Sequence, residues 1–136
     1  MADSFIVLVV DDNDATLKTL GDFLKISGYQ VILANDGKEA WDIICSRIHD
    51  IGVLITDYMM PNLDGEGLIR NIRLAKIDIP LVILSSATIK TNQTLLDLSR
   101  ELNIRLLPKP FECDDLLDLI SSSVRTQRKV STKSDI

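Results

Sequence analysis

Three aspartates stand at the ends of two apolar runs. Asp11 and Asp12 directly follow the run Ile6–Val10, and Asp57 closely follows a run that begins at Val53. If these runs are neighbouring strands, three carboxylates meet, and unit charges about 4 Å apart repel by about 4 kcal/mol at an effective dielectric near 20. Such a cluster requires a cation, and a hard divalent ion such as Mg²⁺ prefers oxygen ligands of this kind.

Two further polar residues end or follow apolar runs. Lys109 comes shortly after a run at residues 106–107, and Ser85 directly follows the run at residues 81–84. The ammonium group could supply one positive charge, and the hydroxyl group could donate a hydrogen bond in the same cleft. Acids, a hydroxyl and a lysine together suit phosphoryl transfer to a carboxylate, with Asp57 attacking in line.

The apolar runs alternate with segments of helical spacing. Five runs begin at Ile6, Val31, Val53, Leu81 and Leu106. Their lack of polar alternation is typical of strands that are buried on both faces. Helical spacing is found near residues 17–24, 36–44, 64–72, 91–101 and 114–124. Strict βα alternation predicts a parallel sheet with helices on both faces, and ligands of such sheets bind at the carboxyl ends of the strands.

Length, composition and charge exclude several classes of protein. The chain has 136 residues, of which 46% are hydrophobic and 26% charged, as expected for one globular domain. Its longest apolar run, residues 5–10, is too short for a membrane span, and no secretory signal is recognisable, so we expect a cytoplasmic protein. The net charge of −5 argues against direct binding of nucleic acid. Cys45 and Cys113 lack metal-ligand spacing and are predicted to be reduced packing residues.

Five short fragments, taken together and in order, resemble the receiver domain of two-component response regulators. They are VVDD at 9–12, ANDGKEA at 34–40, TDYMMP at 56–61 followed by Asp64 and Gly65, PLVILS at 80–85, and KPF at 109–111. The resemblance covers about residues 5–124. It implies an α/β, flavodoxin-like (βα)5 fold, which is a doubly wound parallel sheet with strand order 2-1-3-4-5. Residues 125–136, with four basic residues and one acidic residue, are then a polar tail or linker stub.

The resemblance also implies a role for each polar residue of the cluster. Asp57 would be the phosphoacceptor, Ser85 would contact the phosphoryl group, and Lys109 would be the family's invariant lysine, followed by a cis peptide bond. The implied cofactor is Mg²⁺ or Mn²⁺. Its protein ligands would be Asp12, Asp57 and the backbone carbonyl of Met59, with Asp11 acting mainly through water.

One position departs from the family pattern. Many family members carry Tyr or Phe three positions before the invariant lysine, and inward rotation of that ring accompanies activation. Here the residue is Leu106, so an aromatic switch cannot operate in the usual way. The resemblance further implies that the fourth helix, fifth strand and fifth helix form the output face, which is also a possible surface for a homodimer.

The leading hypothesis is a phosphorylatable switch of a bacterial two-component system. A sensor histidine kinase or phosphotransfer protein would donate the phosphoryl group, and an unidentified downstream protein would bind the altered face. The chain would be a regulatory phosphoacceptor rather than an enzyme, and either a stand-alone receiver or a piece of a longer regulator. One alternative is an interaction module that works without phosphorylation. Another is an aspartyl-nucleophile phosphohydrolase, which needs an acid where this chain has Met59.

Overall fold

The computed structural model describes residues 5–89 and 92–122, so the predicted tail at 125–136 lies outside the described residues. One parallel sheet has the strand order β2-β1-β3-β4-β5, which confirms the predicted doubly wound, flavodoxin-like fold. The strands are β1 (Ile6–Val10), β2 (Gln30–Ala34), β3 (Ile51–Asp57), β4 (Leu81–Ser86) and β5 (Arg105–Pro108). The helices between them are α1 (Asp14–Ile26), α2 (Gly37–Ser46), α3 (Gly65–Leu74) and α4 (Gln93–Leu102). A last helix begins at residue 113 and is described as far as residue 122.

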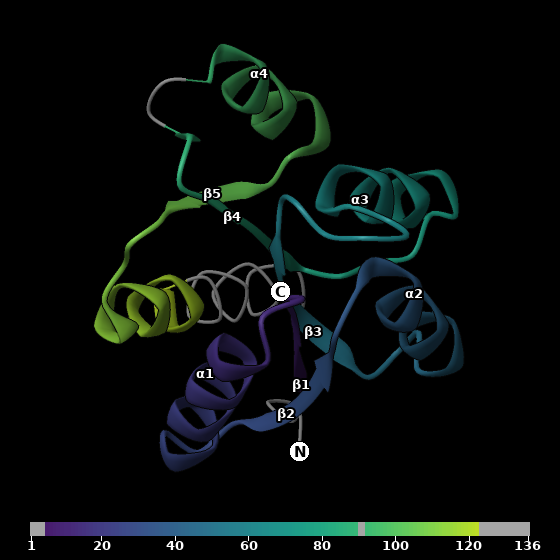
Figure 1. Cartoon of the computed structure of the whole chain (residues 1–136). Helices are drawn as coiled ribbons and strands as arrows, with labels where there is room; N and C mark the ends of the chain where they lie inside the picture. The colour runs from purple at the N-terminus through teal and green to yellow at the C-terminus, as the bar shows by residue number, and fades with distance from the viewer. Residues whose placement is uncertain (1–4, 90–91, 123–136) are drawn as a thin grey trace, which may run out of the picture.

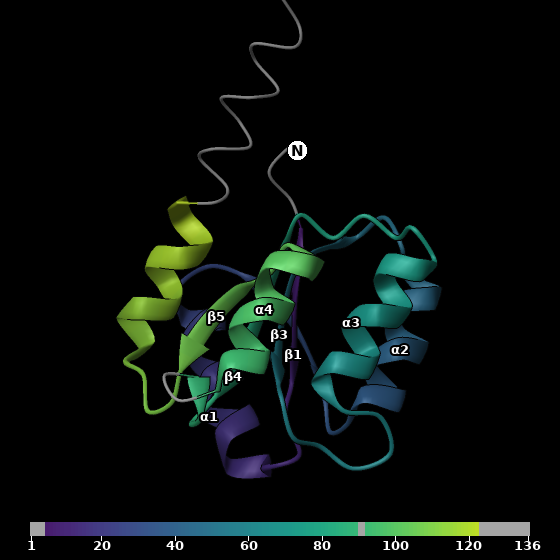
Figure 2. The same ribbon diagram turned by 90° about the horizontal axis from the view of Figure 1, so that it is seen from above.

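The helices form a layer on each face of the sheet (Figures 1 and 2). Successive residues of a strand point to opposite faces, so Val7 and Val9 of β1 pack toward α1 and the last helix. Leu8 and Val10 pack instead toward α2, α3 and α4. Both faces of β1 are therefore buried, and its apolar run without polar alternation follows from this position in the sheet.

The two edge strands differ from the prediction of burial on both faces. In β2 only Ala34 is buried, and in β5 only Leu107 is buried. Each of these strands has a single neighbour in the sheet, so the helices that cover the central strands leave the edge strands partly exposed. The apolar runs identified the strands correctly but not their depth in the sheet.

Each of α1 to α4 begins with a side-chain cap at the carboxyl edge of the sheet. The caps are Asn13, Asp36, Asp64 and Asn92, and each accepts a hydrogen bond from the backbone N–H three residues later. The loops that follow the strands are thereby held at defined positions. Gly28, just after α1, has a φ of 100°, in agreement with the predicted helix end.

The two cysteines occupy different environments. Cys113 is partly buried and packs against the core beneath α1 and the last helix, as predicted. Cys45 is exposed on α2, so its predicted packing role is wrong. Within residues 5–89 and 92–122, no helix is both long enough and apolar enough to cross a bilayer.

Candidate metal centre at the carboxyl end of the sheet

The three aspartates come together because their strands are neighbours. β1 pairs with β3 in a register that sets Val10 opposite Thr56, so the next residues, Asp11 and Asp57, leave the sheet side by side. Together with Asp12, they offer three carboxylate oxygens that all lie within 4.8 Å of one another. Asp11 is buried, Asp57 is half-buried and Asp12 is exposed, so the cluster opens to solvent on one side.

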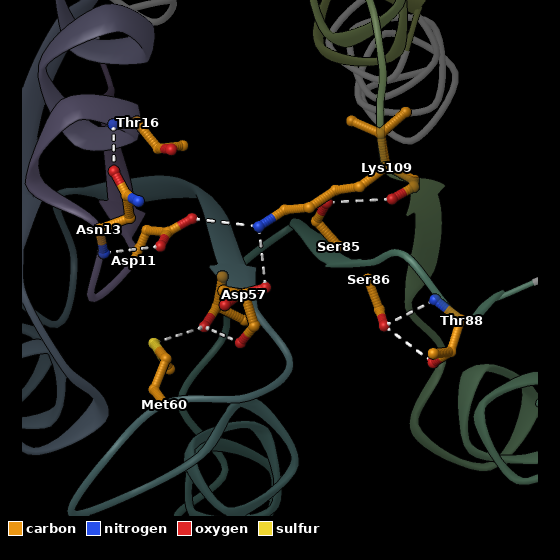
Figure 3. Close-up of polar contacts among 11 residues, drawn as sticks. Asp11, Asn13, Thr16, Asp57, Met60, Ser85, Ser86, Thr88 and Lys109 are labelled. Atoms are coloured by element: carbon orange, nitrogen blue, oxygen red, sulfur yellow. Dashed lines mark hydrogen bonds and ion pairs between the residues drawn. The ribbon is translucent and has the colours of Figure 1, made fainter.

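Lys109 reaches this cluster from the other side of β4. Its Nζ lies 3.0 Å from Oδ1 of Asp57 and 3.3 Å from Oδ2 of Asp11 (Figure 3). Its backbone N–H donates to the carbonyl of Ser86, which fixes the start of the loop after β5. The Lys109–Pro110 peptide bond is cis, as the resemblance implied.

Burial and charge act against each other at this site. Burial raises the pKa of Asp57 above its ordinary value, although the hydrogen bond and the charge of Lys109 oppose this shift. Burial likewise disfavours the charged form of Lys109, but the hydrogen bond to Asp57 and the charges of Asp11 and Asp57 outweigh it and raise the pKa of Lys109. The ammonium is therefore held charged, whereas the Asp57 carboxylate is only partly compensated.

The donor set fits a hard divalent cation. One lysine offsets one of the three carboxylates, and the remaining negative charge lies on oxygens close enough to share one ion. Asp11 is already fixed, since its Oδ1 accepts the backbone N–H of Asn13 at 2.9 Å. The residues present therefore fit the divalent ion that the sequence implied.

Ser85 lies next to Asp57 in the sheet, but its hydroxyl group forms its hydrogen bond with β5. The β3–β4 register pairs the two residues, and the Ser85 hydroxyl is buried, donating to the carbonyl oxygen of Leu107 at 3.0 Å. In this conformation the hydroxyl is held by the β5 backbone. The Ser86 hydroxyl oxygen, by contrast, accepts the backbone N–H of Thr88 and also hydrogen-bonds the Thr88 hydroxyl group, a local structural contact (Figure 3).

The two remaining sequence-predicted residues, Met59 and Leu106, differ in their exposure. Met59 is 69% exposed. Leu106 is partly buried and packs against the core under α2, α3 and α4. It thus occupies the position of the usual aromatic residue with a smaller side chain.

Two features of the site were not predicted. A groove of about 570 Å³ lies beside Lys109 and is mainly apolar. It is lined by Ala15, Thr16, Thr19, Leu20, Ala87, Lys109, Pro110, Phe111 and Cys113. In addition, a Cβ at Gly65 would overlap the backbone carbonyl of Asp57, so only glycine lets α3 start this close to β3. The small residues at the start of α1 could have indicated the groove.

Comparisons with known proteins agree with this geometry. The family model described as the response regulator receiver domain matches residues 7–121. The response regulator MprA of Mycolicibacterium vanbaalenii is 38% identical over 120 residues, which are 88% of this chain and 50% of that protein. The chain therefore spans about half the length of the curated relatives it matches.

Solved structures give the same result. The receiver domain of the Francisella response regulator 1452 superposes with a TM-score of 0.80 at 29% identity, covering 90% of this chain and 98% of that one. A CheX–CheY–BeF3–Mg²⁺ complex from Borrelia burgdorferi matches with a TM-score of 0.78 at 28% identity, covering 87% of each chain. The chain belongs to the receiver domain family of two-component response regulators.

Proposed function

We propose that this receiver domain, residues 5–124, is a cytoplasmic switch that accepts a phosphoryl group on Asp57. The observation that carries the proposal is the cluster of three carboxylates within 4.8 Å, contacted by the ammonium of Lys109. The Asp57 carboxylate is assigned as the nucleophile, because it accepts a hydrogen bond from Lys109 and is paired with Ser85 in the sheet. The family membership of the chain supports this assignment.

The transfer forms one bond and breaks one. A carboxylate oxygen of Asp57 attacks the phosphorus atom of a phosphohistidine, a P–O bond forms, and the P–N bond breaks. The imidazole nitrogen leaves with the electron pair and no atom changes oxidation state. Lys109 is placed to donate to a phosphoryl oxygen, and the Ser85 hydroxyl could donate to another after leaving the Leu107 carbonyl.

The site is proposed to hold Mg²⁺ or Mn²⁺ while the transfer takes place. The protein ligands would be Asp12, Asp57 and the Met59 backbone carbonyl, with Asp11 contributing mainly through water. When bound, the ion would offset negative charge on the carboxylates and on the transferred phosphoryl oxygens. Asp11 also holds Lys109 in place, because its second oxygen accepts from Nζ.

The phosphodonor is proposed to be a protein, either a sensor histidine kinase or a phosphotransfer protein. The groove between α1 and the loop after β5 supports this, since an apolar surface beside the nucleophile suits a docking helix or loop. The solved CheX–CheY complex is consistent with a receiver fold that binds protein partners. The downstream target, also a protein, would bind the face of α4, β5 and the last helix, where a homodimer could also form.

Phosphorylation of the purified protein tests the proposal. Incubation with acetyl phosphate and Mg²⁺ should add the mass of one phosphoryl group to the intact protein, and Asp57→Asn should abolish the addition. Asp78→Asn, at an exposed residue before β4, is the matched control and should be labelled like the wild type. If the wild type gains no mass, or if Asp57→Asn gains as much, the proposal fails.

The outcome also separates the two other functions. A protein that stays unmodified but binds its target would be an interaction module independent of phosphorylation. Steady release of phosphate from an aryl phosphate would indicate a phosphohydrolase. The exposed Met59 offers no acid to protonate a leaving group, so we expect no such turnover.

A further inference from the structure

The start of α2 contacts the loop that carries Met59. This loop, residues 58–64, joins β3 to α3 and is called the β3–α3 loop below. We infer that Asp36 and Gly37 are positioning residues, which fix this loop and thereby the Met59 backbone carbonyl for a divalent ion. The inference rests on the proposed function, in which that carbonyl is a ligand.

Gly37 makes the closer of the two contacts. A Cβ at this position would overlap the backbone carbonyl oxygen of Leu63 and would lie 2.8 Å from its carbonyl carbon. The obstacle is backbone rather than the end of a flexible side chain, so it cannot move aside without moving the loop. Gly37 is buried, and Leu63 itself packs against the core under α2 and α3. The helix start and the loop are therefore in direct backbone contact.

Asp36 makes the second contact with its side chain. One oxygen caps α2 by accepting the backbone N–H of Glu39 at 2.8 Å, and the other accepts the side-chain amide of Asn62 at 2.6 Å. Asn62 has a φ of 69°, a conformation that asparagine tolerates better than most residues. The hydrogen bonds from Glu39 and Asn62 lower the pKa of Asp36, so the carboxylate stays charged and accepts both bonds.

The ends of the loop are also fixed. The backbone N–H of Tyr58 donates to the Ser85 carbonyl at 3.0 Å, and the N–H of Gly65 donates to the Tyr58 carbonyl at 3.0 Å. With Asn62 and Leu63 held by α2, residues 59–61 lie between fixed points, and within this span the Pro61 carbonyl accepts the backbone N–H of Leu63 at 2.8 Å while Met60 Sδ accepts from the Thr56 hydroxyl at 3.9 Å. Pro61 further restricts this short span, because its φ is fixed by the ring. The position of the Met59 carbonyl therefore depends on α2.

A pair of glycine substitutions tests the backbone contact. Gly37→Ala should push the loop and weaken Mg²⁺ binding by about tenfold, the lower end of the loss seen when a supporting group of a metal site is removed. Gly67→Ala is the matched control, because the atoms nearest its Cβ are side-chain atoms of Leu63 and Asp64, and the closest, Leu63 Cδ1 at 2.7 Å, is the end of a side chain that can move without moving the backbone. It adds the same methyl group to a helix next to the same loop and should leave the affinity unchanged. Isothermal titration calorimetry with Mg²⁺ measures the affinity of both variants and of the wild type.

An exchange of side chains tests the Asp36–Asn62 bond. Asn62→Gly keeps the positive φ available but removes the amide, and it should weaken Mg²⁺ binding by about fivefold, as expected for losing one hydrogen bond. The double variant Asp36→Asn with Asn62→Asp swaps donor and acceptor, and it should recover most of the affinity. Rescue of this kind is not expected if the two residues act independently on stability.

Hydrogen exchange in EDTA gives a readout that does not depend on the metal. The amides of residues 58–60 and 62–64 should exchange faster in Gly37→Ala and Asn62→Gly than in the wild type and in Gly67→Ala. If Gly37→Ala does not fold, Asn62→Gly and the exchanged pair decide the question.

Unchanged Mg²⁺ affinity in the folded variants would overturn the inference while leaving the proposed function intact. Loss of Mg²⁺ binding in the wild type itself would overturn both. Recovery of Mg²⁺ affinity in the double variant would support the inference. If Asn62→Gly loses affinity and the double variant does not recover it, the role of the Asp36–Asn62 bond is refuted.

Discussion

Replacing Asp57 by asparagine should stabilise the metal-free protein at neutral pH. With an effective dielectric near 20, the attraction to Lys109 at 3.0 Å is about 5.5 kcal/mol, and the repulsion from each neighbouring aspartate, within 4.8 Å, is at least about 3.5 kcal/mol. The two repulsions together exceed the attraction, and burial of the charge adds to the cost. Because Asp12 is exposed and its repulsion is partly screened, the gain is limited, and we expect Asp57→Asn to raise the free energy of unfolding by only about 1–2 kcal/mol, mainly by removing the buried charge.

The stabilisation should depend on pH in a defined direction. Because burial raises the pKa of Asp57 in the folded protein, folding favours the neutral carboxyl group. The wild type is therefore penalised above that raised pKa, and the penalty disappears as the pH falls below the ordinary value of 3.8. The difference between Asp57→Asn and the wild type should shrink on acidification and should be largest near neutral pH.

Urea unfolding in EDTA and in Mg²⁺ measures this difference. Trp41, half-buried on α2, is a convenient fluorescence probe, and Asp78→Asn controls for the loss of one negative charge. In EDTA, Asp57→Asn should be the more stable protein. Mg²⁺ should stabilise the wild type more than the variant and reverse their order. A variant that is less stable than the wild type in EDTA, or an equal gain from Mg²⁺ in both, would refute the reasoning.

Substitutions at four further residues test other contacts of the fold and the site. Lys109→Met leaves the charge of the aspartates without a neighbouring cation, so its free energy of unfolding in EDTA should be about 1–3 kcal/mol lower than that of the wild type, and the loss should be smaller in Mg²⁺. Urea unfolding measures both values, and equal stability of the variant and the wild type in EDTA would contradict the expectation. Ser85→Ala removes the bond to Leu107 and should cost about 1 kcal/mol, whereas Ser85→Thr should cost less if its hydroxyl keeps that bond. Arg73→Gln loses two bonds to carbonyls at the end of α4 and should cost about 1–2 kcal/mol with faster amide exchange there. Arg70→Gln, whose ion pairs with Glu66 and Glu101 are partly exposed, should lower the free energy of unfolding less than Arg73→Gln does, and an equal effect of the two substitutions would refute the comparison.

The sheet and its acidic edge could be predicted from the sequence by combining local patterns with the family resemblance. Apolar runs alternating with helical segments predict a parallel sheet, and the strand order that the resemblance implied brings Asp11 and Asp57 side by side. The position of Lys109 followed from the same rule. No side-chain orientation was needed for these predictions.

Features that depend on side-chain conformation or on distant contacts could not be predicted. The Ser85 hydroxyl was expected to face the cleft. In the structure its rotamer, which the sequence does not specify, lets the hydroxyl donate to the Leu107 carbonyl. Gly37 and Leu63 are far apart in the chain, and only the packing of α2 against the β3–α3 loop brings them together. The exposure of Cys45 likewise depends on which face of α2 meets the core.

The central claim is that Asp57 carries the phosphoryl group, and reductive trapping tests it most directly. After incubation with acetyl phosphate and Mg²⁺, borohydride should convert the aspartyl phosphate to homoserine, which peptide mass spectrometry can locate. We predict homoserine at position 57 and none at positions 11 or 12. Homoserine at another aspartate, or none in a protein that binds Mg²⁺ and remains folded, would contradict the claim.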